Sequence, residues 1–368
     1  MPLDAGTIKQ FIAAFKKSEK PLIDNVATEL ELTIIDNEAF LTSINSQSKQ
    51  RPVNSYVVSP VTAFGHYALD EIRRLHRPWV TWPLKLLVLS CRSLFVSGRL
   101  DSVVNINNWL LSTNIYPATW QGDGGLAAVK TMAGNHPDKA ITFRSLNTHA
   151  NSSLLANLLK QGFIGVPSRQ VYIFDFRKDA SVLHQRHNNR MDAKLLAKMP
   201  FKRCQAASFS EGDFKRAEYL YRDLYVNKYS ELNPQYTAEW LKLGALQGWL
   251  ELEGLRNEQG ELDGVVGWVV ASDTVTAPIV GYDTSKPAKL GLYRLLTHLC
   301  LLRAANENKR LNFSSGAAHF KRLRGGEPAI EYSAIYIAHL PFWPRFVWRL
   351  LSFLLTKIAV PLMQRWQL

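Results

Sequence analysis

The chain has 368 residues, of which 46% are hydrophobic and 20% are charged, and its formal net charge is +13. This composition excludes a disordered or fibrous protein, and the length favours two domains. No basic tail concentrates the positive charge, so it favours a folded surface with an acidic partner, such as nucleic acid, an anionic membrane or a polyphosphate-bearing cofactor.

The few cysteines and histidines show no metal-ligand or disulfide pattern. Cys91, Cys204 and Cys300 are far apart, and the chain contains no CxxC motif. The N-terminus lacks the apolar segment and cleavage pattern of a signal peptide. We therefore expect a cytoplasmic protein without a bound metal. No nucleic-acid-binding module is recognisable, so tRNA is the only nucleic acid that we retain as a partner.

The first half of the chain predicts alternating strands and helices. Apolar alternation indicates strands at 31–45 and 55–59, followed by a helix at about 63–75. The segment 79–97 is apolar and rich in tryptophan but contains basic residues, which favours a buried or interfacial helix over a membrane span. A series of strand, helix, strand, helix and strand follows, at 103–117, 126–133, 140–143, 152–161 and 170–176.

The second half repeats this order after a charged, histidine-rich linker at 181–206. Its elements are helices at 213–226 and 237–248, strands at 249–255 and 265–271, a helix at 290–307, a strand at 311–313, a helix at 317–323 and a strand that begins at 330. The order of elements in 103–176 thus recurs in 265–337, without a repeat of the sequence itself. This recurrence predicts two copies of one small α/β domain.

Two polar segments are candidate sites. The connections within 309–332 are short, so its polar residues gather at one mouth of an α/β unit, where ligands bind in open sheets. The strand-like run 105–114 is unusually rich in amides, and Arg144, Ser145 and Asn147 follow on the next strand. Buried amides need hydrogen-bond partners, so this run either forms an internal network or lines a polar pocket.

The second half resembles the GNAT acyltransferase superfamily, in particular the duplicated-GNAT branch that includes Fem-type peptidyltransferases. The resemblance rests on LDGVVGWVV, GLYRLLTHLCLLRAANENK, LNFSSG, AAHFKRLRGG and EYSAIYI, and the first half resembles the partner domain through NNWLLSTNIYP and ITFRSLN. It implies an α/β fold of two tandem GNAT-like domains, with mixed central sheets flanked by helices. The expected boundaries are 1–180 for the first domain, 181–206 for the linker, 207–340 for the second domain and 341–368 for an amphipathic C-terminal helix.

The resemblance also implies a donor site. GNAT enzymes bind the pyrophosphate of acyl-CoA at a helix N-terminus, where unpaired amides and the helix dipole attract an anion. Lys286, Lys289 and Gly291 precede the corresponding helix here, but the usual glycine-rich loop is incomplete. An acyl carrier or aminoacyl-tRNA is therefore an alternative to acyl-CoA as donor. Further candidate donor-binding residues are Ser314, Ser315, Gly316, Lys321 and Arg324.

Acyl transfer to an amine requires a base and donors for the tetrahedral oxyanion. His319 and Glu331 are candidate bases, and the resemblance implies that Tyr332 protonates the leaving thiolate. A surface histidine on a basic helix is the alternative reading of His319. The candidate substrate-binding residues are Asn107, Asn108, Ser112, Asn114, Arg144 and Asn147.

The C-terminal segment from Pro344 predicts an amphipathic helix that ends at Pro361. It either packs on the core or lies in a bilayer interface together with 79–97. The expected function is N-acyl transfer from acyl-CoA or an acyl carrier to a small or lipid-like amine. The alternatives are aminoacyl transfer from tRNA and a silent GNAT-like module that binds a membrane or an anionic partner.

Overall fold

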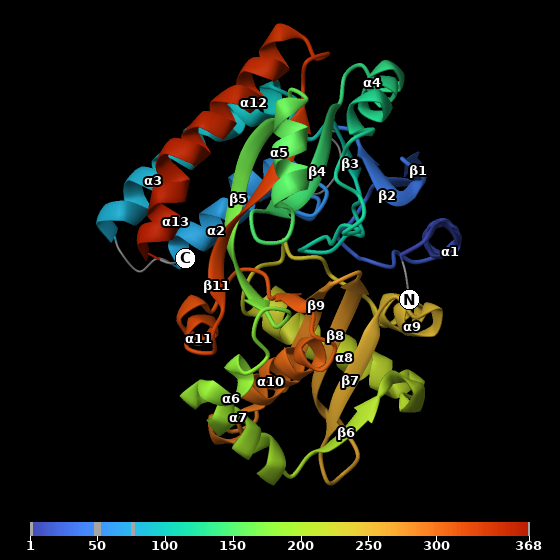
Figure 1. Cartoon of the computed structure of the whole chain (residues 1–368), viewed down its shortest axis with the longest axis vertical. Helices are drawn as coiled ribbons and strands as arrows, with labels where there is room; N and C mark the ends of the chain where they lie inside the picture. Colours follow the sequence, from blue (N-terminus) through green and yellow to red (C-terminus); the bar gives the residue numbers. More distant parts are fainter. Residues whose placement is uncertain (1–2, 48–52, 75–77, 367–368) are drawn as a thin grey trace.

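One mixed sheet runs through the whole molecule (Figure 1). The structure, a computed structural model, describes residues 3–47, 53–74 and 78–366. In these residues the strand order is β1-β2-β3-β4-β11-β5-β10-β9-β8-β7-β6. The strands are β1 Glu29–Ile35, β2 Glu38–Asn45, β3 Val103–Ile106, β4 Ala140–Asn147, β5 Ile164–Asp175, β6 Lys202–Gln205, β7 Glu251–Arg256, β8 Leu262–Ala271, β9 Thr274–Tyr282, β10 Arg310–Asn312 and β11 Glu327–Tyr336.

Helices cover the sheet on both faces. Gly264 and Gly281 show why they pack closely: a Cβ atom on Gly264 would lie 3.3 Å from Leu296 of α10, and one on Gly281 would lie 2.5 Å from the backbone of Tyr221 in α8. The described helices are α1 Ala5–Lys17, η1 Thr62–Tyr67, α2 Ala68–Arg73, α3 Pro78–Ser97, α4 Gly125–Asn135, α5 Ser152–Lys160, α6 Val182–Gln185, α7 His187–Lys198, η2 Ala206–Ser208, α8 Glu211–Arg222, η3 Asp223–Asn227, α9 Ala238–Gln247, η4 Ala288–Leu290, α10 Leu292–Ala305, α11 Ala318–Arg322, α12 Phe342–Leu354, η5 Leu355–Ala359 and α13 Val360–Trp366.

The fold is duplicated. In the N-terminal lobe (β1–β4), β1, β2 and β3 are antiparallel neighbours, and α4 connects β3 to the parallel strand β4. In the C-terminal lobe (β6–β10), β7, β8 and β9 are antiparallel neighbours, and α10 connects β9 to the parallel strand β10. The recurring order of elements that the sequence predicts is therefore present in the structure as two related lobes.

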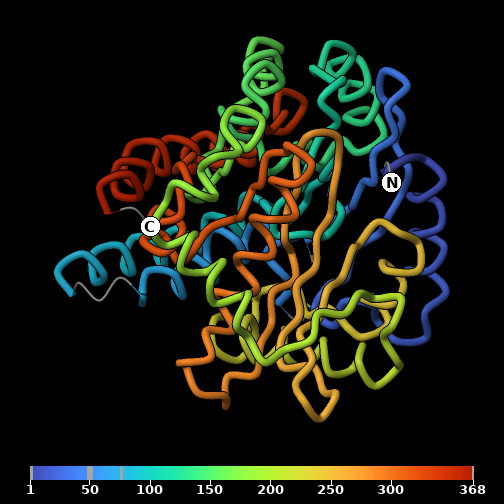
Figure 2. The backbone as a smooth tube through the Cα atoms, turned by 60° about the horizontal axis from the view of Figure 1, so that its bottom comes forward, coloured from blue at the N-terminus to red at the C-terminus, as the bar shows by residue number. Residues whose placement is uncertain are grey.

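The lobes exchange their final strands. β5, which follows the N-terminal lobe in sequence, pairs with β10 of the C-terminal lobe, while β11 pairs with β4 of the N-terminal lobe. β5 and β11 pair with each other at the centre of the sheet, in the register Glu327↔Ile173 to Ile335↔Ile164. The tube in Figure 2 follows the same continuous arrangement from another side. Each lobe thus depends on a strand from the other half of the chain.

Each lobe has one pair of parallel strands, β3 with β4 and β9 with β10, and the carboxyl ends of each pair lie at one edge of the sheet. We call the region around Ile106, Asn147 and the start of α5 the N-terminal mouth. The region around Tyr282, the turn after β10 and the start of α10 is the C-terminal mouth. Ligands bind at such strand ends in open α/β sheets. The two mouths are therefore the places to compare for a site.

Several predicted segments have a different structure. Of the predicted strand 103–117, only Val103–Ile106 is a strand, and 107–117 is a loop. The predicted linker 181–206 contains α6, α7 and β6. The predicted strand at 55–59 is wrong: this segment is a turn, in which side chains of Asn108 and Arg144 donate to the carbonyl of Val57 instead of a neighbouring strand. The C-terminal helix does not end at Pro361, because the π-helical segment η5 precedes it and the proline lies in the first turn of α13. Residue 75 of the predicted helix 63–75 and the last two residues of 341–368 lie outside the described residues.

Candidate functional site

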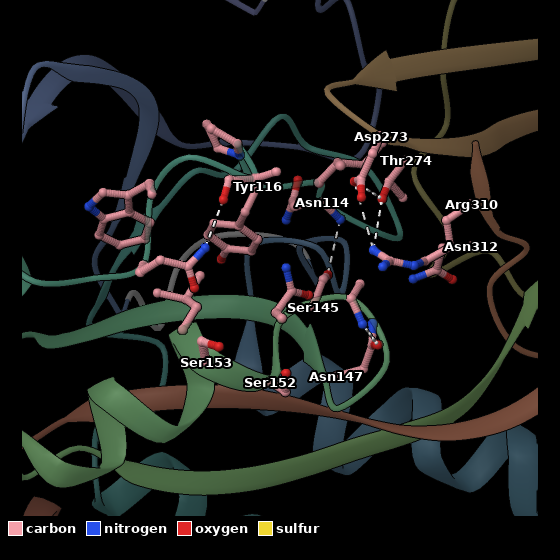
Figure 3. A pocket seen from close by; sticks show the side chains of 18 of the residues that line it. Asn114, Tyr116, Ser145, Asn147, Ser152, Ser153, Asp273, Thr274, Arg310 and Asn312 are labelled. Atoms are coloured by element: carbon pink, nitrogen blue, oxygen red, sulfur yellow. Dashed lines mark hydrogen bonds and ion pairs between the residues drawn. The ribbon is translucent and has the colours of Figure 1, made fainter. Parts of the chain in front are cut away.

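A polar cavity of about 170 Å³ lies at the N-terminal mouth, between the two lobes. The N-terminal lobe contributes the loop 114–121, the end of β4 and the start of α5. Figure 3 shows Arg310, Asn312, Asp273 and Thr274 of the C-terminal lobe facing these elements across the cavity. The cavity therefore exists only when both lobes are in place.

The turn before α5 contains a cavity-lining asparagine whose amide donor is buried. Asn147 is 1% exposed, and its Oδ1 accepts hydrogen bonds from the backbone N–H groups of His149 (3.0 Å) and Ala150 (2.8 Å). Its Nδ2 has no hydrogen-bond partner in the part of the chain that the structure describes. No side chain caps the N-terminus of α5, and Ser152 and Ser153 of its first turn line the cavity. Unpaired donors at the positive end of a helix attract an anion.

Arg310 contributes a buried cation to the same cavity. Its side chain is 6% exposed, and burial lowers the pKa of its guanidinium. Its Nη1 donates to Thr274 Oγ1 (3.3 Å), whereas Nε lies 3.6 Å from Asp175 Oδ2 and makes no hydrogen bond in the described structure. Arg177, which also ion-pairs with Asp175 and Asp273, forms the cavity rim. A guanidinium with unused donors binds a carboxylate or phosphate well.

The amide-rich run forms a network and also reaches the cavity. Asn107 donates to the carbonyl of Ile115 (2.8 Å), and Asn108 donates to Ser43 Oγ (2.8 Å). Asn114 lines the cavity, and its backbone N–H donates to Ser145 Oγ (3.0 Å). Ser145 adopts a left-handed backbone conformation with φ of 65°, which distinguishes it from an ordinary strand residue. Some residues of this run therefore form an internal network, as Asn107 and Asn108 do, whereas Asn114 lines the polar cavity.

Arg144 extends the amide network through Asn108, whereas Ser112 belongs to a neighbouring buried network around Arg169. Arg144 donates to Asn108 Oδ1 (3.0 Å). Arg169 donates to Glu331 Oε1 (2.9 Å), to Thr113 Oγ1 (2.9 Å) and to the carbonyl of Ser112. Of the six residues predicted to bind substrate, the structure brings Asn114 and Asn147 to the cavity, and the others support the surrounding loops.

The three candidate catalytic residues lie in different environments and do not form one site. His319 is exposed on α11. Glu331 is buried in β11, where it ion-pairs with Arg169. Tyr332 is the next residue of that strand and packs instead against the hydrophobic cluster that contains Phe163, and burial raises the pKa of its hydroxyl. This arrangement does not place a base and an acid at one position.

The C-terminal mouth is filled by its own side chains. Tyr293 contacts Tyr282 and Phe320, with ring centroids 6.2 and 4.9 Å apart. Lys286 ion-pairs with Asp263 (3.4 Å), Lys289 is exposed, and a Cβ atom on Gly291 would lie 2.7 Å from Leu195 of α7. The predicted donor-binding residues at the start of α10 therefore lie under α7 or on the outer surface.

Other predicted donor-binding residues stabilise the turn after β10. Lys321 is 4% exposed, and its Nζ donates to the carbonyls of Phe313 (2.6 Å), Ser314 (3.3 Å) and Ser315 (2.8 Å). Burial lowers the pKa of Lys321 to about 7. Arg324 donates to Asp192 (2.6 Å), which also accepts from Arg294 (2.7 Å). Gly316 lies exposed in the turn with φ of 78°.

The sequence reasoning missed the cavity residues of the C-terminal lobe, Arg177, Asp273, Thr274, Arg310 and Asn312. An arginine at the first position of a short, buried strand was a usable signal, because a cation buried in a strand needs a specific partner. Its position opposite Asn147 depends on the strand exchange, which no local pattern reveals. No cluster of three or more metal-ligating side chains is found in the described residues.

No protein-family model and no curated protein sequence shows a significant match to the chain. Among solved structures, FemX is similar with a TM-score of 0.51 at 9% identity, over 89% of this chain and 96% of that one. L-PGS from Bacillus licheniformis is similar with a TM-score of 0.50 at 8% identity, over 95% and 97%. A tandem GNAT protein from the clavulanic acid biosynthesis pathway has a TM-score of 0.35 at 11% identity, over 63% and 75%.

These likenesses extend over nearly the whole chain for the first two proteins, and they agree with the two related lobes described above. At such low identity they identify the fold and leave the chemistry open. The chain therefore has the same two-lobed fold as FemX and L-PGS.

Proposed function

We propose that the protein is an acyltransferase that moves an acyl group to the amine of a small acceptor that also carries an anionic group. The observation that carries this proposal is the inter-lobe cavity, where Arg310, Asn147 Nδ2 and the start of α5 all present donors without full partners. Such donors suit a carboxylate or phosphate of the acceptor. The similarity of the fold to FemX and L-PGS also supports a transferase.

The reaction needs a place for the acceptor amine as well as for its anion. Asp273 carries the carboxylate among the lining residues, and it lies near Arg310, with 3.8 Å between Oδ1 and Nη1. We propose that Asp273 binds the ammonium form and receives its proton. The free amine attacks the acyl carbonyl, a C–N bond forms, the bond to the donor breaks, and the leaving group takes up a proton.

The donor is proposed as acyl-CoA or an acyl carrier, with aminoacyl-tRNA as the second candidate. The net charge of +13 favours the second candidate, because a basic surface attracts a polyanion. The lysines at the start of α10, one ion-paired and one exposed, are less suited to CoA than a glycine-rich loop would be. The experiment therefore has to compare the donors directly.

The test incubates the protein with a panel of acyl-CoAs or with mixed aminoacyl-tRNAs, each with amino acids or with phosphoethanolamine as acceptor. Mass spectrometry identifies the amide product, and free thiol is measured for the CoA donors. We expect Arg310→Met to lower kcat/KM about 100-fold, because a buried charged hydrogen bond contributes up to about 3 kcal/mol.

Arg303→Met is the matched control, since Arg303 of α10 forms an ion pair with Glu251 of β7 and neither residue lines the cavity. The thermal unfolding temperature of both variants shows whether a loss of activity comes from the lost contact or from unfolding of the protein. Product formation that Arg310→Met leaves unchanged would refute the cavity as the acceptor site. Absence of any product with every donor would refute the proposed reaction and favour a silent binding module.

A further inference from the structure

Two long apolar helices lie side by side on one edge of the molecule (Figure 1). α3 and the α12–α13 helix run antiparallel: the rings of Trp79 and Trp366 are 6.0 Å apart at one end, and Trp343 donates to Ser97 Oγ (3.2 Å) at the other. In the described residues, Pro78–Ser97 and Phe342–Trp366 are long and apolar enough to cross a membrane. Length and composition alone do not decide whether they do so.

The inner sides of these helices belong to the folded core. Val347, Trp348 and Leu351 are at most 3% exposed, and they share a hydrophobic cluster with Cys91 and Phe95 of α3. A Cβ atom on Gly98 would lie 2.7 Å from Val347, so the contact between the two helices is close. Ser352 donates to the carbonyl of Gly165 in β5 (2.7 Å). Both helices are therefore anchored along the body, which fits a surface position and not a span.

The outer sides are apolar and exposed. On α3, Trp79 is 70% exposed, Trp82 62% and Leu86 61%, and their spacing of three and four residues places them on one face. On α12, Phe342 is 71% exposed and Phe353 58%. Because the helices pack side by side, these residues form one outer surface. Apolar side chains gathered in this way mark an interaction surface.

The charged residues of the two helical segments themselves have one sign. The segments 78–100 and 341–368 contain no Asp or Glu. Their basic residues are Lys85, Arg92, Arg99, Arg345, Arg349, Lys357 and Arg365. Lys85 lies over the ring of Trp82 at 5.3 Å, which combines a cation and an indole at one position. Tryptophan with Lys or Arg is the composition of helices that lie in the headgroup region of anionic bilayers.

We propose that the outer surface of α3, α12 and α13 docks onto an anionic lipid bilayer, with the helices parallel to the membrane plane. The aromatic and leucine side chains enter the boundary between headgroups and acyl chains. The surrounding Lys and Arg side chains contact the lipid phosphates. The proposal does not depend on the acyltransferase reaction, because it uses only residues outside the inter-lobe cavity.

The test measures co-flotation of the full chain with vesicles of phosphatidylglycerol and phosphatidylcholine, and with vesicles of phosphatidylcholine alone. We expect binding to the anionic vesicles that falls at least tenfold on the neutral ones and in high salt. The double variant Leu86→Ser with Phe353→Ser should lower binding at least tenfold. Arg349→Gln with Lys357→Gln should lower it about tenfold on anionic vesicles only.

The control variant Leu246→Ser changes an exposed leucine of α9, which is 75% exposed, and should leave binding unchanged. Point substitutions are preferable to deletion of 344–368, because that deletion would remove core residues such as Trp348. Equal binding of the wild type and both double variants would overturn the proposal. So would a stable dimer in light scattering that the apolar double variant dissociates, since a second copy would then cover the surface.

Discussion

The two mouths of this protein have the same strand arrangement, but their polar side chains differ in whether they have hydrogen-bond partners. At the N-terminal mouth, Asn147 and Arg310 keep donors without partners around a cavity. At the C-terminal mouth, Lys321 uses its ammonium group on three carbonyls, and Asp192 holds two arginines. Duplication thus produced one mouth with unsatisfied polar groups, which suits ligand binding, and one whose polar groups stabilise the fold.

The largest expected effect tests the structural role of the C-terminal mouth. Asp192 is fully buried and accepts hydrogen bonds from Arg294 and Arg324. Asp192→Asn leaves these cations without their counter-charge, so the free energy of unfolding should fall by about 3–5 kcal/mol. Urea denaturation measures it. The KM of the remaining folded enzyme should stay unchanged, and a raised KM with unchanged stability would break the comparison.

The next effect tests ligand binding at the N-terminal mouth. Asn147→Asp keeps the Oδ1 acceptor for the N–H groups of His149 and Ala150, but replaces the free Nδ2 donor with a negative oxygen. We expect kcat/KM for an anionic acceptor to fall about 100-fold, because attraction becomes repulsion. Steady-state kinetics with thermal unfolding checks both parts.

The exposed residue His319 is the matched test in the other mouth. His319→Ala should change kcat/KM less than twofold, because His319 does not line the cavity. A loss as large as that of Asn147→Asp would move the chemistry to α11 and reverse the comparison.

A further effect is a pH dependence of stability that arises from Lys321. The unfolded chain holds this proton up to its ordinary pKa of 10.5, whereas the folded chain releases it above about pH 7. The folded state therefore binds fewer protons between these values, and the free energy of unfolding rises with pH. We expect a rise of about 2 kcal/mol between pH 7 and 9, relative to Lys321→Met.

The control for this rise is Lys289→Met, which removes an exposed lysine of the same mouth and should keep the wild-type pH dependence. Chemical denaturation at several pH values measures all three proteins. Parallel curves for the wild type and Lys321→Met would show that the three carbonyl contacts keep Lys321 charged, and that the mouth is more polar than we infer.

Local pattern predicted much of the fold and little of the site. The recurring order of strands and helices was readable because hydrophobic periodicity is a local property. The strand exchange could not be predicted, because the residues of β11 do not indicate which lobe it pairs with. The prediction for 55–59 was wrong because its structure also depends on distant residues. Its sequence resembles that of a strand, but the side chains of Asn108 and Arg144 donate to the carbonyl of Val57.

The candidate site divides in the same way. Asn114 and Asn147 were identifiable because amides in an apolar strand need partners. Arg310 was missed because its importance comes from facing the other lobe. Lys321 and Arg324 were noticed as cations, but sequence spacing does not reveal that carbonyls of residues 313–315 and the carboxylate of Asp192 surround them.

The exchange of β5 and β11 has a consequence for biosynthesis. Strand β4 pairs with β3 on one side, but its other neighbour is β11, through pairs such as Asn147↔Glu331, so the N-terminal lobe stays incomplete until almost the whole chain has left the ribosome. Contacts of such long sequence separation also slow folding. Nascent chains that stop before residue 327 leave an open sheet edge, which is a template for aggregation. The topology therefore leaves this edge of β4 unpaired during most of the synthesis of the chain.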